Sequence, residues 1–210
     1  MKRTGPTSVA LLLLLQAPIA PAQARAASFI VTSGMDTIAV ESFAATSASL
    51  TGTLRLPQQQ ASARYVIRLR PDGSVAEAEV MDDAPNFFSG TITFDERAAI
   101  DLRANAPRRR FIMAPAATYP AVGTSLALME ELARVTHATT RDSTTAQVFN
   151  IRNRIVGTAT IRRLRGDSVA IDCAGCQRAG SHQNIHVGVA PNGDFTGGVE
   201  IEQGWVITRH

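Results

Sequence analysis

Alternation of apolar and polar residues with a period of two is the strongest pattern in this chain. It is clearest from Arg64 to Arg70, where three apolar side chains share one face and arginines take most of the other. Successive side chains in a strand point to opposite faces, so the pattern predicts a half-buried strand. The turn signal Pro71-Asp72-Gly73-Ser74 and the run from Val75 to Val80 complete a predicted hairpin.

Strand-like runs recur over most of the chain. They span residues 37–43, 50–56, 90–94, 98–103, 108–113, 146–151, 155–163, 168–172, 184–190, 195–201 and 205–209. The turn Pro191-Asn192-Gly193-Asp194 repeats the proline–Asx–glycine order of Pro71 to Gly73, which hints at a duplicated half. We expect a sheet with this many strands to curl, because strongly twisted open sheets rarely stay flat at that size.

One segment changes from the strand period to the helical period. Leu126, Met129 and Ala133 recur at helical spacing, and a second apolar row lies beside them. Thr124 or Ser125 can cap the start of this segment, so we predict a helix over about 125–136. Its apolar arc is wide, which is typical of a helix covered on several sides.

Together these elements predict an α+β fold that is mostly β: a curved antiparallel sheet, half-barrel or barrel-like, packed around one central helix. The order of hairpins, a crossing helix from Val122 to Val135, and further hairpins resembles the half-barrel of periplasmic lipoprotein carriers and related uncharacterised exported proteins. That resemblance implies a concave apolar face able to hold an acyl chain or similar ligand. The candidate ligand-binding residues on this face are Tyr65, Ile67, Leu69, Leu128 and Leu132.

The first two dozen residues have the composition of a secretory signal peptide. Lys2 and Arg3 precede the apolar run from Val9 to Leu15, and small residues follow at Ala22-Gln23-Ala24 and Ala24-Arg25-Ala26. We therefore predict a signal peptide over residues 1–24, with cleavage at the latest after residue 27, and one β-rich domain over 28–210. The interrupted apolar run is too short to span a membrane, so we expect an exported, periplasmic or secreted protein without a membrane span after processing.

Charge and aromatic content argue against a nucleic-acid partner. The formal net charge of +3 falls to about +1 when Lys2 and Arg3 are removed with the signal peptide. Aromatic residues make up 5% of the chain, which is too few for a platform on which bases stack. We expect a small apolar molecule or lipid as the partner, and the sequence identifies no protein partner.

The motif Cys173-Ala174-Gly175-Cys176 has three interpretations. An exported protein favours a disulfide or structural cysteines. His182 and His186 complete a C-x2-C-x5-H-x3-H pattern, whose sulfur and nitrogen atoms are ligands that zinc accepts. A redox-active pair is the third interpretation, although such pairs normally open a helix and no helix is predicted here.

No set of residues indicates a catalytic nucleophile with its base, so we assign no catalytic residues. Ser125 lies in Gly123-Thr124-Ser125-Leu126-Ala127, where a nucleophile elbow would need glycine in place of Ala127. We expect Ser125 to cap the helix. The leading hypothesis is an exported non-enzymatic binding or carrier protein for an apolar or amphipathic molecule in the cell envelope. The alternatives are a metal-binding or redox protein that uses the Cys/His cluster, and a structural or interaction module.

Overall fold

The computed structural model describes residues 24–83, 88–95, 99–104, 110–113, 118–137, 142–151, 153–176 and 182–210. The predicted signal segment before residue 24 lies outside them. The elements are β1 (Arg25–Ser33), β2 (Asp36–Ala45), β3 (Ser49–Leu56), η1 (Pro57–Gln59), β4 (Ala61–Leu69), β5 (Val75–Asp82), β6 (Gly90–Asp95), β7 (Ala99–Ala104), β8 (Arg110–Met113), β9 (Tyr119–Ala121), α1 (Leu126–His137), β10 (Ser143–Asn150), β11 (Ile155–Arg163), β12 (Ser168–Ala174), β13 (His182–Val189), β14 (Phe195–Glu200) and β15 (Trp205–Arg209).

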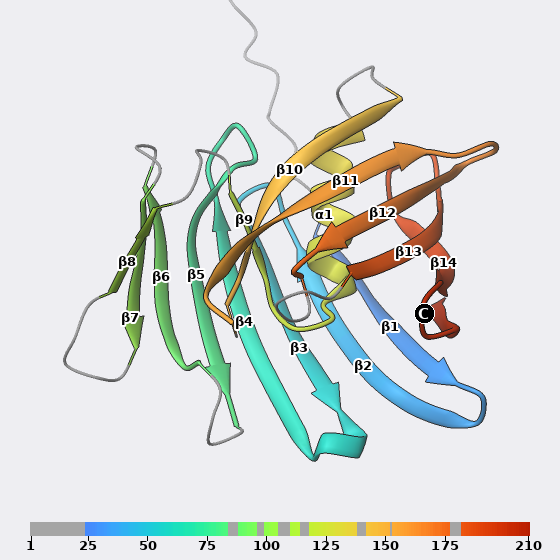
Figure 1. Cartoon of the computed structure of the whole chain (residues 1–210), viewed down its shortest axis with the longest axis horizontal. Coiled ribbons are helices and arrows are strands. Elements are labelled where there is room, and N and C mark those ends of the chain that lie inside the picture. The colour runs from blue at the N-terminus through green and yellow to red at the C-terminus, as the bar shows by residue number, and fades with distance from the viewer. Residues whose placement is uncertain are drawn as a thin grey trace, which may run out of the picture.

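All the described strands belong to one sheet of 15 strands in the order β8-β7-β6-β5-β4-β3-β2-β1-β15-β14-β13-β12-β11-β10-β9. Neighbouring strands are antiparallel, except that β9 pairs with β10 in parallel. The two halves of the chain meet where β1 pairs with β15, with Phe29 opposite Arg209. Figure 1 shows the sheet curling around α1, with β8 to β1 on one side and β15 to β10 on the other. The predicted fold class is thus confirmed.

The strand alternation is confirmed most clearly in β4. Ala61, Ala63, Tyr65 and Ile67 are buried, whereas Arg64 and Arg68 are exposed. Two strands were not anticipated: β9, which lies where a loop was expected, and β1, which already begins at Arg25, ahead of the domain start expected at residue 28. The inward residues Phe29 and Val31 of β1 belong to the core, so the described domain includes this strand.

The two proline–Asx–glycine turns adopt the same local structure. The Asp72 side chain accepts a hydrogen bond from the backbone N–H of Ser74 at 2.9 Å, and the Asn192 side chain accepts one from Asp194 at 3.1 Å. Gly73 and Gly193 have φ of 81° and 84°, values that favour glycine. Both turns lie beside the C-terminal half of α1, so the sheet encloses this end of the helix from two sides.

The helix fills the concave side of the sheet. It spans Leu126–His137, one residue later at each end than the sequence predicts. Leu126, Met129 and Leu132 are at most 3% exposed and belong to one core cluster with strand residues from both halves. The wide apolar arc is explained by this arrangement, because both halves of the sheet contact the helix.

Candidate functional site

An apolar pocket lies at the N-terminal end of α1, where β3, β4 and β5 approach the chain between β9 and the helix. Its cavity volume is about 50 Å³. The lining residues are Leu54, Leu56, Ala61, Ser62, Ala63, Val80, Asp82, Phe88, Val122, Gly123 and Ile151. Ser62 and Asp82 are the polar members, so a ligand here would meet mainly hydrocarbon. Sequence periodicity did not reveal this pocket, because its lining comes from strand ends and connections.

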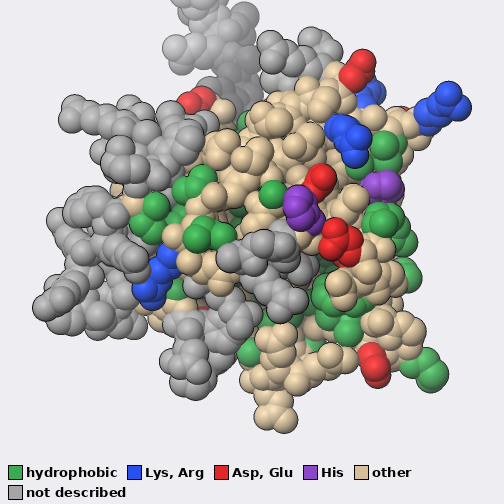
Figure 2. All heavy atoms as spheres, in the orientation of Figure 1, with side chains coloured by type: hydrophobic (Ala, Val, Ile, Leu, Met, Phe, Trp, Pro, Cys, Tyr) green, Lys and Arg blue, Asp and Glu red, His purple; other side chains and the backbone are tan. Residues whose placement is uncertain are grey.

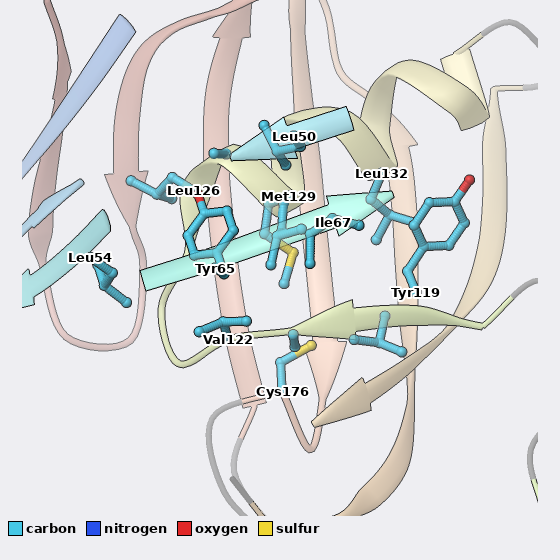
Figure 3. Close-up of a cluster of buried hydrophobic side chains, with 14 of the residues drawn as sticks. Leu50, Leu54, Tyr65, Ile67, Tyr119, Val122, Leu126, Met129, Leu132 and Cys176 are labelled. Atoms are coloured by element: carbon cyan, nitrogen blue, oxygen red, sulfur yellow. The ribbon is translucent and has the colours of Figure 1, made fainter. Parts of the chain in front are cut away.

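The five residues expected to bind a ligand lie elsewhere in the interior. Tyr65, Ile67, Leu128 and Leu132 are buried in the core, and Leu69 packs against it partly buried. Figure 3 shows Tyr65 and Ile67 directed toward Met129 of the helix. None of the five lines the apolar pocket. The reason is the helix, which carries Leu128 and Leu132 and covers the concave face on which the three β4 residues lie. A ligand contact at these five residues stays a prediction.

A buried carboxylate fixes the start of the helix. Glu41, on the inner face of β2, is 2% exposed. Its Oε2 accepts hydrogen bonds from the backbone N–H groups of Leu126 at 2.7 Å and Ala127 at 3.0 Å. Its Oε1 accepts from the Ser125 hydroxyl at 2.5 Å and from the Tyr65 hydroxyl at 2.6 Å. The first N–H groups of a helix have no partner within it, and Glu41 supplies one from a distant strand.

Ser125 completes this cap, as expected from its position. Its hydroxyl oxygen accepts a hydrogen bond from the Leu128 N–H at 3.3 Å. Burial raises the pKa of Glu41, although hydrogen bonds from Ser125, Tyr65, Ala127 and Leu126 act in the opposite direction. Burial, followed by the Glu41 charge, raises the pKa of Tyr65 well above its usual value. The group is enclosed in the core, so its role is to hold the helix in place.

The alternation of apolar and polar residues along β2 could have identified Glu41 in the sequence as a buried carboxylate. It lies between Ala39 and Phe43 on the same face, and both are buried. A carboxylate on an otherwise apolar strand face needs donors, because an unpaired buried charge is strongly unfavourable. The sequence does not reveal that these donors come from α1, more than eighty residues away.

A second buried carboxylate organises an ion cluster on the helix. Glu130 has a side chain that is 1% exposed and accepts a hydrogen bond from the Phe195 N–H at 2.8 Å. Arg25 approaches it at 3.2 Å, and Arg209 also pairs with it. Asp194 binds Arg25 at 2.9 Å. Together these ion pairs connect the first strand, the last strand and the β13–β14 turn to α1.

Burial raises the pKa of Glu130, against the lowering effects of the Phe195 N–H and of Arg209. Asp194 has its pKa lowered, because hydrogen bonds from Arg134 and Arg25 and the charge of Arg209 outweigh its partial burial. The Arg209 guanidinium also lies over the Phe29 ring, 5.4 Å from its centroid. The cluster is closed by its own partners, and its role is to fasten the two chain halves to the helix.

Cys173 and Cys176 form a disulfide, and both residues are 1% exposed. The predicted histidine ligands do not join them. Cys173 lies on the inner face of β12, whereas His182 and His186 lie on the outer face of β13. The ring of His182 contacts exposed Asp172 at 3.3 Å.

The four-ligand arrangement is therefore not formed, since the cysteines and histidines point to opposite sides of the sheet. No group of three or more His, Cys, Asp or Glu side chains suited to a metal ion occurs among the described residues. The helical segment of the described chain is also too short to cross a membrane as an apolar helix.

Solved structures with this fold are found, although the chain matches no protein-family model and no curated protein. A DUF1089 family protein from Pseudomonas aeruginosa superposes with a TM-score of 0.59 at 12% identity, over 88% of this chain and 95% of that one. A beta-barrel-like protein of the domain of unknown function DUF1849 from Brucella abortus gives 0.52 at 11% identity, over 90% and 98%. Neither is described as a lipoprotein carrier, so that resemblance stays a prediction. At such identities the likeness shows a shared barrel-like fold.

Proposed function

We propose that this protein is an exported binding or carrier protein whose apolar pocket receives the hydrocarbon end of an apolar or amphipathic small molecule. The observation that carries the proposal is the pocket between the β3–β5 strand ends and Val122–Gly123. Its lining is largely aliphatic, with Ser62 and Asp82 as the polar members. An apolar cavity of this kind stays dry more readily than a polar one, and it favours hydrocarbon over water.

The size of the pocket sets what it can hold. Pockets for drug-sized ligands measure about 300–1,000 Å³. The cavity here is about 50 Å³, so it accommodates the tip of an acyl chain with the remainder outside. An amphipathic molecule suits such a partly enclosed site, because its polar part stays in water. The signal-peptide pattern and the disulfide are both compatible with an exported carrier.

Native mass spectrometry of the processed protein, recovered without chelator or reductant, tests the proposal. We expect a mass excess that corresponds to a lipid or another amphiphile. A bound zinc ion that chelation removes would favour the metal-binding alternative instead. A bare chain with its disulfide, together with no binding of fatty acids added afterwards, would overturn the carrier proposal and leave a structural or interaction module.

A pair of variants locates the binding site. Ala61→Phe places a large side chain at the pocket wall, so it should reduce retention of an added long-chain fatty acid at least tenfold. Ala48→Phe makes the same change in an exposed turn and should bind as the parent protein does. Circular dichroism confirms that both variants are folded. Equal binding by both variants would exclude this pocket as the site.

A further inference from the structure

The hairpin between β11 and β12 ends in a basic tip formed by Arg162, Arg163, Leu164 and Arg165, here called the arginine tip. All four residues are exposed, Leu164 by 36%. Across the described ranges, none of the three arginines forms an ion pair or side-chain hydrogen bond. Figure 1 shows the hairpin extending past its neighbours, and Figure 2 shows basic side chains gathered at that corner.

The neighbouring acids leave the tip with a positive excess. Asp167 lies in the same loop and Asp142 lies beside the start of β10, and both are exposed. The backbone carbonyl oxygens of these two aspartates accept hydrogen bonds from Val189 and Arg163. The region around the tip thus carries three guanidinium groups and two carboxylates, and the guanidinium groups are concentrated at the apex of the hairpin. Arginine stays charged at every physiological pH, so this excess is permanent.

A cleft opens at the base of the arginine tip, between it and the β13–β14 turn. Its volume is about 430 Å³, and Arg163, Arg134, Ser168 and Asn192 are among its lining residues. Arg134 is held by Asp194 at 2.6 Å and by Glu131, whose Oε2 lies 3.5 Å from the Arg134 Nε, so Arg163 is the cleft arginine without an ion pair among the described residues. The cleft therefore offers the Arg163 guanidinium, the Ser168 hydroxyl and the Asn192 amide, with Asp167 as its acidic member, in a space large enough for a phosphate-bearing headgroup.

We propose that the arginine tip docks on the surface of an anionic lipid bilayer, with Leu164 entering the interface and the cleft receiving a lipid phosphate. A tip of four residues is convex and small, whereas a specific protein interface buries about 800 Å² on each partner. A lipid surface is deformable, so a projecting tip can enter it. Its phosphate groups can bind the arginines, and its hydrocarbon can contact Leu164. The tip has no aromatic side chain on which a nucleic-acid base would stack.

Sedimentation with vesicles tests this docking on the full processed chain. The vesicles contain equal parts phosphatidylcholine and phosphatidylglycerol, or phosphatidylcholine alone. Each arginine near an anionic surface contributes about fivefold in binding, so the triple variant R162Q/R163Q/R165Q should bind anionic vesicles about a hundredfold more weakly. Added salt should weaken binding of the parent protein, because it screens the attraction. Leu164→Ala should bind several-fold more weakly and keep the salt dependence.

The matched control is R55Q/R64Q/R154Q, which removes exposed arginines from β3, from β4 and from the β10–β11 turn and changes the net charge equally. It should bind anionic vesicles as the parent protein does. Equal loss in both triple variants would mean a diffuse charge effect, and no binding of the parent protein to anionic vesicles would mean a different partner; either result overturns the docking. Sedimentation with vesicles does not require the apolar pocket, so its result is independent of the carrier proposal.

Discussion

Replacement of Glu41 tests whether the helix is held by a carboxylate from β2. In Glu41→Ala, the N–H groups of Leu126 and Ala127 lose their acceptor in an apolar interior. Each unsatisfied buried donor costs about 1–3 kcal/mol, whereas the Tyr65 and Ser125 hydroxyls can reorient and lose less. A cavity is left as well. We expect the free energy of unfolding to fall by about 4 kcal/mol, measured by urea denaturation with far-ultraviolet circular dichroism.

Glu41→Gln separates the acceptor from the charge. Glutamine keeps one oxygen for the two backbone N–H groups and turns its amide toward the hydroxyls, so we expect a change within about 1 kcal/mol at neutral pH. Because burial raises the folded-state pKa of Glu41, ionisation weakens the fold. Stability of the parent protein relative to this variant should therefore fall as the pH rises from the unfolded-state value through the raised folded-state value.

The control for both variants is Glu79→Ala on the outer face of β5, which should stay within about 0.5 kcal/mol of the parent protein. Loss of less than about 1 kcal/mol in Glu41→Ala, or equal losses in the alanine and glutamine variants, would refute the reasoning that an acceptor oxygen anchors the helix.

Three other predictions follow from the clusters. Glu130→Gln should lower the free energy of unfolding by about 3 kcal/mol, because the substitution leaves Arg209 and the Phe195 N–H with a weaker acceptor. Thermal denaturation measures this loss, and an unchanged midpoint would contradict the prediction. The double variant C173S/C176S should lose about 2 kcal/mol in a urea titration, since the disulfide closes a very short loop; unfolding of the reduced chain without denaturant would contradict that estimate. N-terminal sequencing of the exported protein should begin at Arg25, because cleavage after Ala26 would remove the side chain that pairs with Glu130, Glu131 and Asp194; a start at Ala27 would contradict it.

Local pattern was enough to predict most of the fold. Alternation identified strands such as β4, both proline–Asx–glycine turns followed from residues with restricted or permissive φ, and helical spacing located α1 to within one residue. These features depend on neighbours in the chain, so the sequence contains them directly. The strand over Arg25–Ser33 was missed because it adjoins the predicted signal segment, and the boundary was placed inside it.

Only the tertiary structure decided which side chains meet. The cysteines pair with each other, and the histidines point away because the β12–β13 register places Cys173 opposite Gln183, so that His182 and His186 lie on the other face of the sheet. The residues expected to bind a ligand lie in the core or pack against it where the helix meets β4, and the apolar pocket forms from strand ends that converge only after the sheet curls. Glu41 and its helix are joined in the same way, by a contact that no local pattern encodes. Sequence therefore determined the elements and their buried faces, while the curling of the sheet around α1 determined the cavities and the charge clusters.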